Sequence, residues 1–177
     1  LLAAYALTKS NHKFFFRDDA NECYDAIGYS VSQWNFNRSL RDAGKHFGSS
    51  HIVFGGPSAC EVKEFSAIIG EGEEAFAYWL DTGKLPLLTR PVPDIDDIPS
   101  PYTTGLFDSL VNPKSQAIVE TVRGCPFGCA YCAWGKGSTR VRMHSLEYVK
   151  EEAEWMGVNK IKYVFCADGN FGMFPRD

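Results

Sequence analysis

Short apolar runs alternate with segments of helical period through the first half of the chain. The runs have the length and composition of buried strands, and they stand at residues 13–16 (KFFF), 25–31 (DAIGYSV), 51–56 (HIVFGG) and 66–70 (SAIIG). Strands that alternate with helices favour a parallel sheet with crossover helices. The pattern therefore predicts an α/β fold whose first half is a Rossmann-like parallel-sheet domain.

Three segments of this half have the apolar spacing of a helix face: LLAAYALTK at the start, the segment that follows Asn37, and EEAFAYWLDTG. The second and third are followed by Gly48 and Gly83, and glycine commonly terminates a helix. We interpret the repeated apolar residues as core positions and not as ligand contacts; they are Leu40, Ala43, Phe47, Phe76, Trp79 and Leu80.

The composition changes between Lys84 and Tyr102. This stretch, KLPLLTRPVPDIDDIPSPY, holds five prolines and three aspartates, and proline lacks the amide that helices and sheets require. We predict a linker at residues 84–114, which separates the Rossmann-like domain (residues 1–83) from a second domain (residues 115–177).

The second half begins another β/α unit. SQAIVETVRG (115–124) is predicted as a strand that leads into a cysteine-containing loop, and IKYVFCADGNF (161–171) as the next strand. Between them, SLEYVKEEAEWMG is predicted as a helix with Ser145 as its N-cap and Gly157 beyond its end. Its expected buried face consists of Leu146, Val149, Ala153 and Met156.

The charge and hydropathy of the chain exclude some classes of partner. Eighteen Lys and Arg residues against 22 Asp and Glu residues give a net charge of −4, and the basic residues are dispersed, so nothing marks a surface for a nucleic-acid backbone. No apolar run approaches the roughly 20 residues of a membrane-spanning helix. We expect a cytoplasmic protein with neither a nucleic acid nor a membrane as partner.

The six cysteines fall into two groups. Cys23, Cys60 and Cys166 are scattered in apolar or mixed segments, where buried free thiols are more common than disulfides. The other three stand together in the stretch CPFGCAYC, at residues 125, 129 and 132. Three thiolates on one tight loop can hold three irons of a four-iron, four-sulfur (4Fe-4S) cluster and leave the fourth iron open to a small molecule. Pro126 and Gly128 suit a chain that wraps closely around an inorganic core.

Two other metal sites are weighed for this loop. A structural zinc site normally takes four ligands, often in two separated pairs, and neither a second CxxC pair nor paired histidines follow. A ferredoxin-like electron carrier also needs a fourth cysteine, at a different spacing. Cys166 is the candidate fourth ligand, but its place within an apolar strand favours burial.

CPFGCAYC resembles the CxxxCx(aromatic)C signature of radical S-adenosylmethionine (radical SAM) enzymes, with Tyr131 at the aromatic position. In that superfamily the open iron is chelated by the amino and carboxylate groups of S-adenosylmethionine, and one electron cleaves its sulfonium to give a 5′-deoxyadenosyl radical. The resemblance implies that Cys125, Cys129 and Cys132 ligate iron and that Tyr131 lies beside the adenine. Direct chelation agrees with the short range that such an electron transfer requires.

The same family places a short polar or glycine-rich motif after the next strand, near the methionine amino group. CADGNFG holds that place here, so the resemblance implies that Asp168 and Asn170 contact S-adenosylmethionine. The sequence departs from the commonest Gly-Gly-Glu form, and Asp-Gly-Asn would also close the strand as an ordinary turn. Lys136, Arg140 and Arg142 could meet the substrate or the cofactor carboxylate, although a solvated face is the commoner role of such a run.

Four segments of the first half resemble the N-terminal cobalamin-binding domain and linker of one large class of radical SAM enzymes: GYSVSQWN, HIVFGGPSA, IIGEGEEAF and DIPSPY, in that order. The first three lie at predicted strand ends, and open parallel sheets bind ligands at the carboxyl ends of their strands. Glycines there would let a nucleotide tail approach the backbone, while Glu71 and Glu73 would also suit the positive end of a helix. The implied cobalamin contacts are Ser30, Trp34, Gly55, Gly56, Pro57, Gly70, Glu71, Gly72 and Glu73.

A histidine ligand for cobalt is not expected. The Asp-x-His-x-x-Gly motif that supplies one in some cobalamin proteins is missing from the sequence, and His12, His46, His51 and His144 stand in other contexts. Trp34 could occupy the space near cobalt, although a core position is the commoner role of a tryptophan.

The resemblance implies a radical SAM enzyme with three cofactors, a 4Fe-4S cluster, S-adenosylmethionine and cobalamin, and most simply a methyltransferase that acts on an unactivated carbon. One alternative is a radical SAM enzyme of another reaction type, such as a cyclisation or rearrangement, whose first domain is vestigial or binds substrate. The other is a metal-stapled interaction domain. Expected partners are a small-molecule or peptide substrate and an electron donor such as a flavodoxin or ferredoxin.

We expect the 177 residues to be a piece of a longer enzyme. The family's catalytic domain is a partial β/α barrel of several strand–helix units, and only its beginning follows the predicted linker. The first strand of the cobalamin-binding domain is expected before Leu1. We therefore predict little or no turnover by this piece alone.

Overall fold

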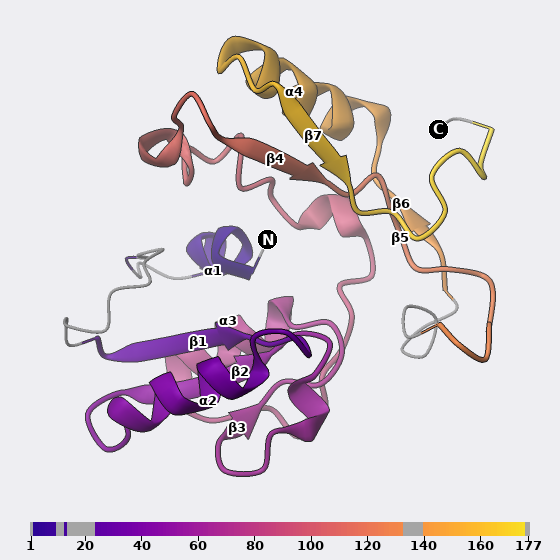
Figure 1. Cartoon of the computed structure of the whole chain (residues 1–177). Helices are drawn as coiled ribbons and strands as arrows, with labels where there is room; N and C mark the ends of the chain where they lie inside the picture. Colours follow the sequence, from indigo (N-terminus) through magenta and orange to yellow (C-terminus); the bar gives the residue numbers. More distant parts are fainter. Residues whose placement is uncertain (1, 10–12, 14–23, 133–139, 176–177) are drawn as a thin grey trace. The chain divides into compact units, whose positions relative to one another are not determined.

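The computed structural model describes residues 2–9, 13, 24–132 and 140–175. The chain divides into two compact units, an N-terminal unit (Leu2–Val92) and a C-terminal unit (Pro93–Asp177) (Figure 1). This division falls inside the predicted linker. Apart from Lys13, the predicted strand at residues 13–16 lies outside the described residues, as does Cys23.

The N-terminal unit is built on a parallel sheet of three strands, β1 (Ala26–Ser30), β2 (His51–Gly55) and β3 (Ser66–Ala67), with β2 in the centre (Figure 1). β1 pairs with β2 along its whole length, from Ala26↔His51 to Ser30↔Gly55. β3 is shorter than the predicted run at 66–70. The sheet confirms the prediction of a mixed α/β fold with parallel strands.

Two helices, α2 (Phe36–Lys45) and α3 (Glu73–Thr82), cover opposite faces of this sheet. Neighbouring residues of a strand face opposite sides: Phe54 packs with Ala43 of α2, whereas Val53 packs with Trp79 of α3. α1 (Leu2–Lys9) packs against α3, and a short 3₁₀ turn, η1 (Ala59–Glu61), follows β2. The core therefore lies on both faces of β2.

The helix ends differ in how well the sequence predicts them. Gly83 ends α3 in the left-handed conformation (φ 68°), and its N–H donates to the Trp79 carbonyl at 2.8 Å, as the pattern predicts. α2 already ends at Lys45. Phe47 lies beyond that end and is 75% exposed, so its prediction as a core residue is wrong.

The C-terminal unit contains the strands β4 (Gln116–Val119), β5 (Val122–Arg123), β6 (Arg142–Met143) and β7 (Tyr163–Cys166), with α4 (Leu146–Val158) between the last two. β4 and β7 form a parallel pair, and β5 and β6 an antiparallel pair (Figure 1). Two 3₁₀ turns precede them, η2 (Ile95–Asp97) and η3 (Asp108–Leu110). The single strand predicted at 115–124 is thus two strands with different partners, and the strand predicted at 161–171 is shorter.

The start of α4 is as predicted and its end is not. The Ser145 hydroxyl caps the helix by accepting a hydrogen bond from the Tyr148 N–H at 3.2 Å. The helix then continues through Gly157 to Val158, so the prediction of Gly157 beyond its end is wrong. The left-handed position after the helix belongs to Lys160, with φ 55°.

The buried face of α4 also differs from the prediction. Glu152 and Met156 are its buried residues, whereas Leu146 and Ala153 are exposed. Glu152 is 4% exposed and accepts a hydrogen bond from the Ser100 hydroxyl at 2.6 Å. A buried carboxylate needs such a donor, and here the linker supplies it. Among the described residues, no helix is long and apolar enough to span a membrane.

Candidate functional site

The residues predicted to contact cobalamin lie along one edge of the N-terminal sheet. Ser30 and Gly55 end β1 and β2 and are paired in register, and Gly70 follows the short β3. The carboxyl ends of parallel strands meet at the same edge of a sheet. The structure thus brings together the three segments that the sequence singles out, and their role toward cobalamin remains a prediction.

The loops after β1 and β2 are bonded to each other at this edge. The Val31 N–H donates to the Gly55 carbonyl at 2.8 Å, and the Ser58 N–H donates to the Val31 carbonyl at 3.1 Å. Gly56 has φ +98°, and a Cβ there would lie 2.8 Å from the Val31 oxygen. A Cβ on Gly55 would meet nothing within 4 Å. The backbone conformation and the nearby Val31 backbone therefore require glycine at position 56. Gly55, in contrast, leaves the open space that a closely approaching ligand needs.

Trp34 lies in the loop after β1 and is 87% exposed, so the core position weighed for it is wrong. The loop is organised by Asn35, which the sequence analysis missed. Its Oδ1 accepts from the Ser32 N–H at 2.8 Å, and its Nδ2 donates to the Ser30 carbonyl at 2.9 Å. Its only sequence signal is that of an ordinary turn asparagine. The result is an exposed tryptophan on a loop that two side-chain hydrogen bonds organise.

The third segment leads into α3. Gly70 has φ +94°, and Gly72 is the N-cap of the helix. Glu73 is its first residue and is 4% exposed, while Glu71 is half-buried. A carboxylate in the first turn is stabilised by the positive end of the helix dipole, which agrees with the capping interpretation of Glu73.

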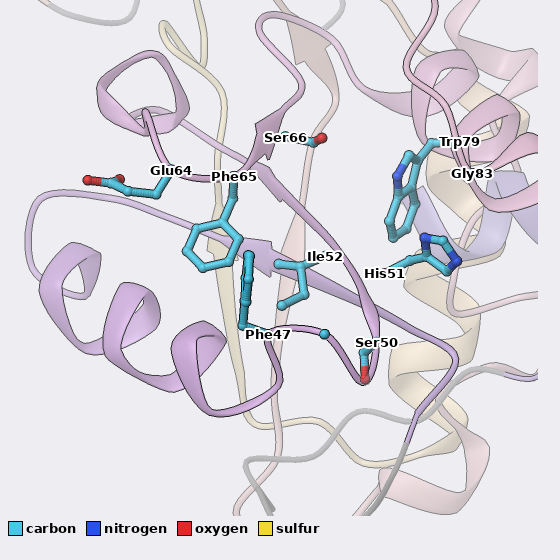
Figure 2. A pocket seen from close by; sticks show the side chains of 10 residues that line it. Phe47, Ser50, His51, Ile52, Glu64, Phe65, Ser66, Trp79 and Gly83 are labelled. Carbon is cyan, nitrogen blue, oxygen red and sulfur yellow. The ribbon is translucent and has the colours of Figure 1, made fainter.

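A pocket of about 270 Å³ lies at the opposite edge of the same sheet (Figure 2). His51 and Ser66, the first residues of β2 and β3, help to line it together with Gly83. Phe47 and Phe65 meet there edge to face, with ring centroids 6.1 Å apart. None of the predicted cobalamin contacts lines this pocket, because it is formed at the amino ends of the strands.

In the C-terminal unit, β5 and β6 hold together the two ends of the cysteine loop. Val122 pairs with Met143, and Arg123 with Arg142, so the segment 124–141 is closed by an antiparallel ribbon. Gly124 opens this loop at φ +96°, where a Cβ would collide with the backbone of the returning segment. Strands of two residues carry no periodic signal, which is why the sequence did not predict the ribbon.

The cysteines of the loop differ in exposure. Cys125 is 8% exposed, Cys132 is half-buried and Cys129 is exposed. The Cys132 N–H donates to the Cys129 carbonyl at 3.1 Å, which forms a turn. Within the part of the chain that the structure describes, no three His, Cys, Asp or Glu side chains lie close enough together to hold a metal ion. The three thiols of the loop accordingly do not meet at a common point.

The segment after β7 is bonded to the start of the cysteine loop. Oδ1 of Asp168 accepts from the N–H groups of Thr121 and Val122 at 2.7 and 3.1 Å, and its Oδ2 accepts from the Thr121 hydroxyl at 2.5 Å. Nδ2 of Asn170 lies 2.9 Å from Sγ of Cys125, to which it donates. The Asp-Gly-Asn motif thus ties β7 to Cys125 as well as closing the strand.

The remaining candidates are exposed, half-buried or outside the described residues. Tyr131 is 92% exposed. Arg140 is exposed and Arg142 half-buried, while Lys136 lies outside the described residues. Cys60 is exposed, so its prediction as a buried thiol is wrong. Cys166, the candidate fourth ligand, ends β7 and is half-buried.

The linker residue Asp96 is bonded to the start of α4. Its two carboxylate oxygens lie 3.1 and 3.0 Å from the Ser145 N–H, and Oδ1 lies 2.8 Å from Nδ1 of the buried His144. Burial lowers the pKa of His144, and Asp96 only partly opposes this. Burial alone would raise the pKa of Asp96, but hydrogen bonds from Ser145 and His144 outweigh it and lower that pKa. The linker is thereby anchored to the helix that follows the cysteine loop.

The DIPSPY motif has a structural role in the same unit. The Tyr102 hydroxyl donates to the Ile118 carbonyl and accepts from the Ile118 N–H, both at 2.8 Å. Burial raises the pKa of Tyr102. Together with the bond from Ser100 to Glu152, these contacts attach the end of the linker to β4 and α4.

Residues 119–177, which begin at the end of β4 and include the cysteine loop, match the Radical SAM superfamily. This match, together with the relatives described next, confirms the resemblance to cobalamin-dependent radical SAM enzymes.

The chain is 31% identical, over 194 aligned positions, to a 2-(S-pantetheinyl)-carbapenam-3-carboxylate methyltransferase from Streptantibioticus cattleyicolor. It is 28% identical, over 193 positions, to the cobalamin-dependent radical SAM methyltransferase TokK from Streptomyces tokunonensis. Each alignment covers 86% of this chain and 28% of the relative. The fold is similar to that of the cobalamin-dependent S-adenosylmethionine radical enzyme OxsB, whose structure was solved with aqua-cobalamin bound. The TM-score is 0.65 at 19% sequence identity, and the match covers 89% of this chain and 27% of OxsB. The chain thus spans little more than a quarter of the length of these proteins.

Proposed function

We propose that this chain is part of a cobalamin-dependent radical SAM enzyme that transfers a methyl group to an unactivated carbon of a small molecule. One observation carries the proposal: the CPFGCAYC loop lies within the segment that matches the Radical SAM superfamily, in a chain whose N-terminal unit offers a glycine-lined sheet edge. The names of the two methyltransferase relatives support the reaction type. Their alignments cover 86% of the chain, more than either unit alone.

The proposal gives each unit a role. The N-terminal unit would be the cobalamin-binding Rossmann-like domain, and β4, α4 and β7 would open the partial β/α barrel. The parallel pairing of β4 with β7 across the intervening helix supports the second assignment, since such a unit is the repeat of a β/α barrel.

The cysteine loop has the donor set that an iron–sulfur cluster requires. Cys125, Cys129 and Cys132 would each ligate one iron, leaving one iron for S-adenosylmethionine. When bound, the cluster would supply the electron that cleaves S-adenosylmethionine, and cobalamin would supply the methyl group. The ribbon of β5 and β6 fixes both ends of the loop, and the exposed Tyr131 and Cys129 leave its outer side accessible to a nucleoside.

Two features of the carboxyl edge of the N-terminal sheet support a corrinoid site. Trp34 offers an exposed flat apolar surface, and Gly55 leaves unfilled space beside the backbone. None of the predicted contact residues is a histidine. His51 belongs to the HIVFGGPSA segment, but it begins β2 at the opposite edge. A cobalamin held here would therefore take no histidine ligand from the predicted contact residues.

Anaerobic reconstitution tests the proposal. The protein is incubated with iron, sulfide and hydroxocobalamin, and the expected results are iron–sulfur absorbance, retained corrinoid absorbance, and an electron paramagnetic resonance signal that changes when S-adenosylmethionine is added. Replacing Cys125, Cys129 or Cys132 by alanine should abolish iron uptake. Cys60→Ala is the matched control, because Cys60 is an exposed cysteine in the other unit.

The outcomes separate the alternatives. Unchanged iron content in all three cysteine variants would refute the proposal. Iron and sulfide without corrinoid would favour a radical SAM enzyme of another reaction type. Stoichiometric zinc without iron–sulfur absorbance would favour a metal-stapled interaction domain.

A further inference from the structure

We infer that Asn170 is a positioning residue for the cluster, whose side-chain amide holds the sulfur of Cys125 and raises the reduction potential of the cluster that this sulfur ligates. The inference rests on the proposed function. It gives Asn170 a role toward a protein ligand of the iron, in addition to the contact with S-adenosylmethionine that the sequence motif implies.

The contact joins distant parts of the chain and is partly buried. Nδ2 of Asn170 lies 2.9 Å from Sγ of Cys125, and the two residues are 45 positions apart in the sequence. Cys125 is 8% exposed, the least exposed of the three loop cysteines, and Asn170 is half-buried. The hydrogen bond therefore replaces solvent at the sulfur, and a bond with reduced access to water is electrostatically stronger than one at the surface.

The sheet determines where Asn170 lies. β7 runs in register with β4 as far as Val119↔Cys166, and the Ala167 N–H extends this pairing by donating to the Val119 carbonyl at 2.8 Å. The pairing therefore places Ala167 at the carboxyl edge of the sheet, and Asn170 follows it by three residues.

Asp168 then fixes this segment against the start of β5. It accepts three hydrogen bonds, from the Thr121 N–H and hydroxyl and from the Val122 N–H. Cys125 follows Val122 by three residues, so the same carboxylate aligns both partners of the Asn170–Cys125 contact. The segments that carry Asn170 and Cys125 are thus joined by backbone pairing and by a carboxylate.

The physical effect follows from charge. A hydrogen-bond donor to a ligating thiolate withdraws electron density from sulfur and favours the more negative, reduced state of the cluster, and such bonds are among the recognised determinants of iron–sulfur potentials. Removing the donor should therefore lower the potential. Replacing it by a carboxylate should lower the potential further, because a negative charge then faces the sulfur.

The test measures the midpoint potential of the reconstituted protein by a redox titration followed by electron paramagnetic resonance. Asn170→Asp keeps the shape of the side chain and removes the donor, and Asn170→Ala removes the whole amide. Gln116→Ala is the matched control, because Gln116 is an exposed amide residue on β4 of the same unit. We expect Asn170→Ala to lower the equilibrium constant for one-electron reduction about tenfold, which corresponds to about 59 mV, Asn170→Asp to lower it more, and Gln116→Ala to leave it unchanged.

Failure of the inference and failure of the proposed function give different results. If the unsubstituted protein takes up no iron–sulfur cluster, the proposed function fails. If it loads a cluster that responds to S-adenosylmethionine, while both Asn170 variants keep the potential of Gln116→Ala, the inference is overturned. An unchanged potential with a lost response to S-adenosylmethionine would likewise overturn it and leave Asn170 as a contact of that cofactor. If Asn170→Ala binds too little iron to be titrated, Asn170→Asp decides the question.

Discussion

Replacing Gly56 by alanine should destabilise the N-terminal unit, whereas the same change at the neighbouring Gly55 should not. Gly56 has φ +98°, and a Cβ there would lie 2.8 Å from the oxygen and 3.0 Å from the nitrogen of Val31. Both are backbone atoms, and they are held by the hydrogen bonds that Val31 makes with Gly55 and Ser58. The loop cannot move away from the new methyl group without losing those bonds.

The magnitude follows from two contributions. Positive φ costs a residue with a side chain roughly 1–2 kcal/mol, and forcing a methyl group into a closely packed position costs about 1–3 kcal/mol. Gly56→Ala should therefore lower the free energy of unfolding by about 2–5 kcal/mol, a large part of the roughly 5–15 kcal/mol of a typical domain. At Gly55 a Cβ meets nothing within 4 Å, so the change there should stay within about 0.5 kcal/mol.

Urea unfolding followed by circular dichroism measures this difference. Gly44→Ala serves as a second control, because a Cβ on this residue of α2 also meets nothing within 4 Å, and alanine in a helix should stabilise by about 0.5–1 kcal/mol. Corrinoid retention gives an independent readout: Gly55→Ala should weaken it without a loss of stability. If Gly56→Ala and Gly55→Ala unfolded at the same urea concentration, the reasoning about the Val31 contact would be refuted.

Three further predictions concern the C-terminal unit. Burial lowers the pKa of His144 below its ordinary value of 6.5. The stability that the neutral ring contributes above that pH should therefore be lost as the pH falls. His144→Gln should flatten this decline in unfolding experiments between about pH 7.5 and 5.5. Burial raises the pKa of Glu152 above 4.5, so stability present below that pH should be lost as the pH rises. Glu152→Gln can still accept the hydrogen bond from Ser100 and should be more stable than the unsubstituted protein at neutral pH. An unchanged pH dependence of stability in the His144 or the Glu152 variant would contradict the prediction for that residue. Lys160 has φ 55°, so Lys160→Gly should raise the free energy of unfolding by up to about 1 kcal/mol. Lys162→Gly is the control at an exposed residue. If both variants gave the same change, the left-handed backbone of Lys160 would not be the cause.

The long periodic elements of this chain are readable from the sequence because packing and local preference agree in them. β1, β2 and α3 each combine an apolar pattern with a clear boundary, and Gly83 ends α3 in the conformation that glycine favours. The carboxyl edge of the sheet follows from the same pattern, since parallel strands must end on one side.

The sequence fails where a contact with a distant segment decides the local structure. The predicted face of α4 omits Glu152, because a glutamate is rarely buried without a partner and its partner Ser100 stands in the linker, 52 residues away. The β5–β6 ribbon depends on pairing between two-residue strands on either side of the cysteine loop. Asn35 looks like any turn asparagine until its two hydrogen bonds are seen.

The geometry of the cysteine loop must come from its surroundings. The loop contributes one backbone hydrogen bond among its described residues, between Cys132 and Cys129, whereas the ribbon of β5 and β6 and the carboxylate of Asp168 hold the chain immediately before Cys125. Cys125 follows this held segment, and its sulfur accepts a hydrogen bond from Asn170, 45 positions away in the sequence. The surroundings of Cys125 therefore depend on residues distant in the sequence, which the cysteine motif alone does not reveal.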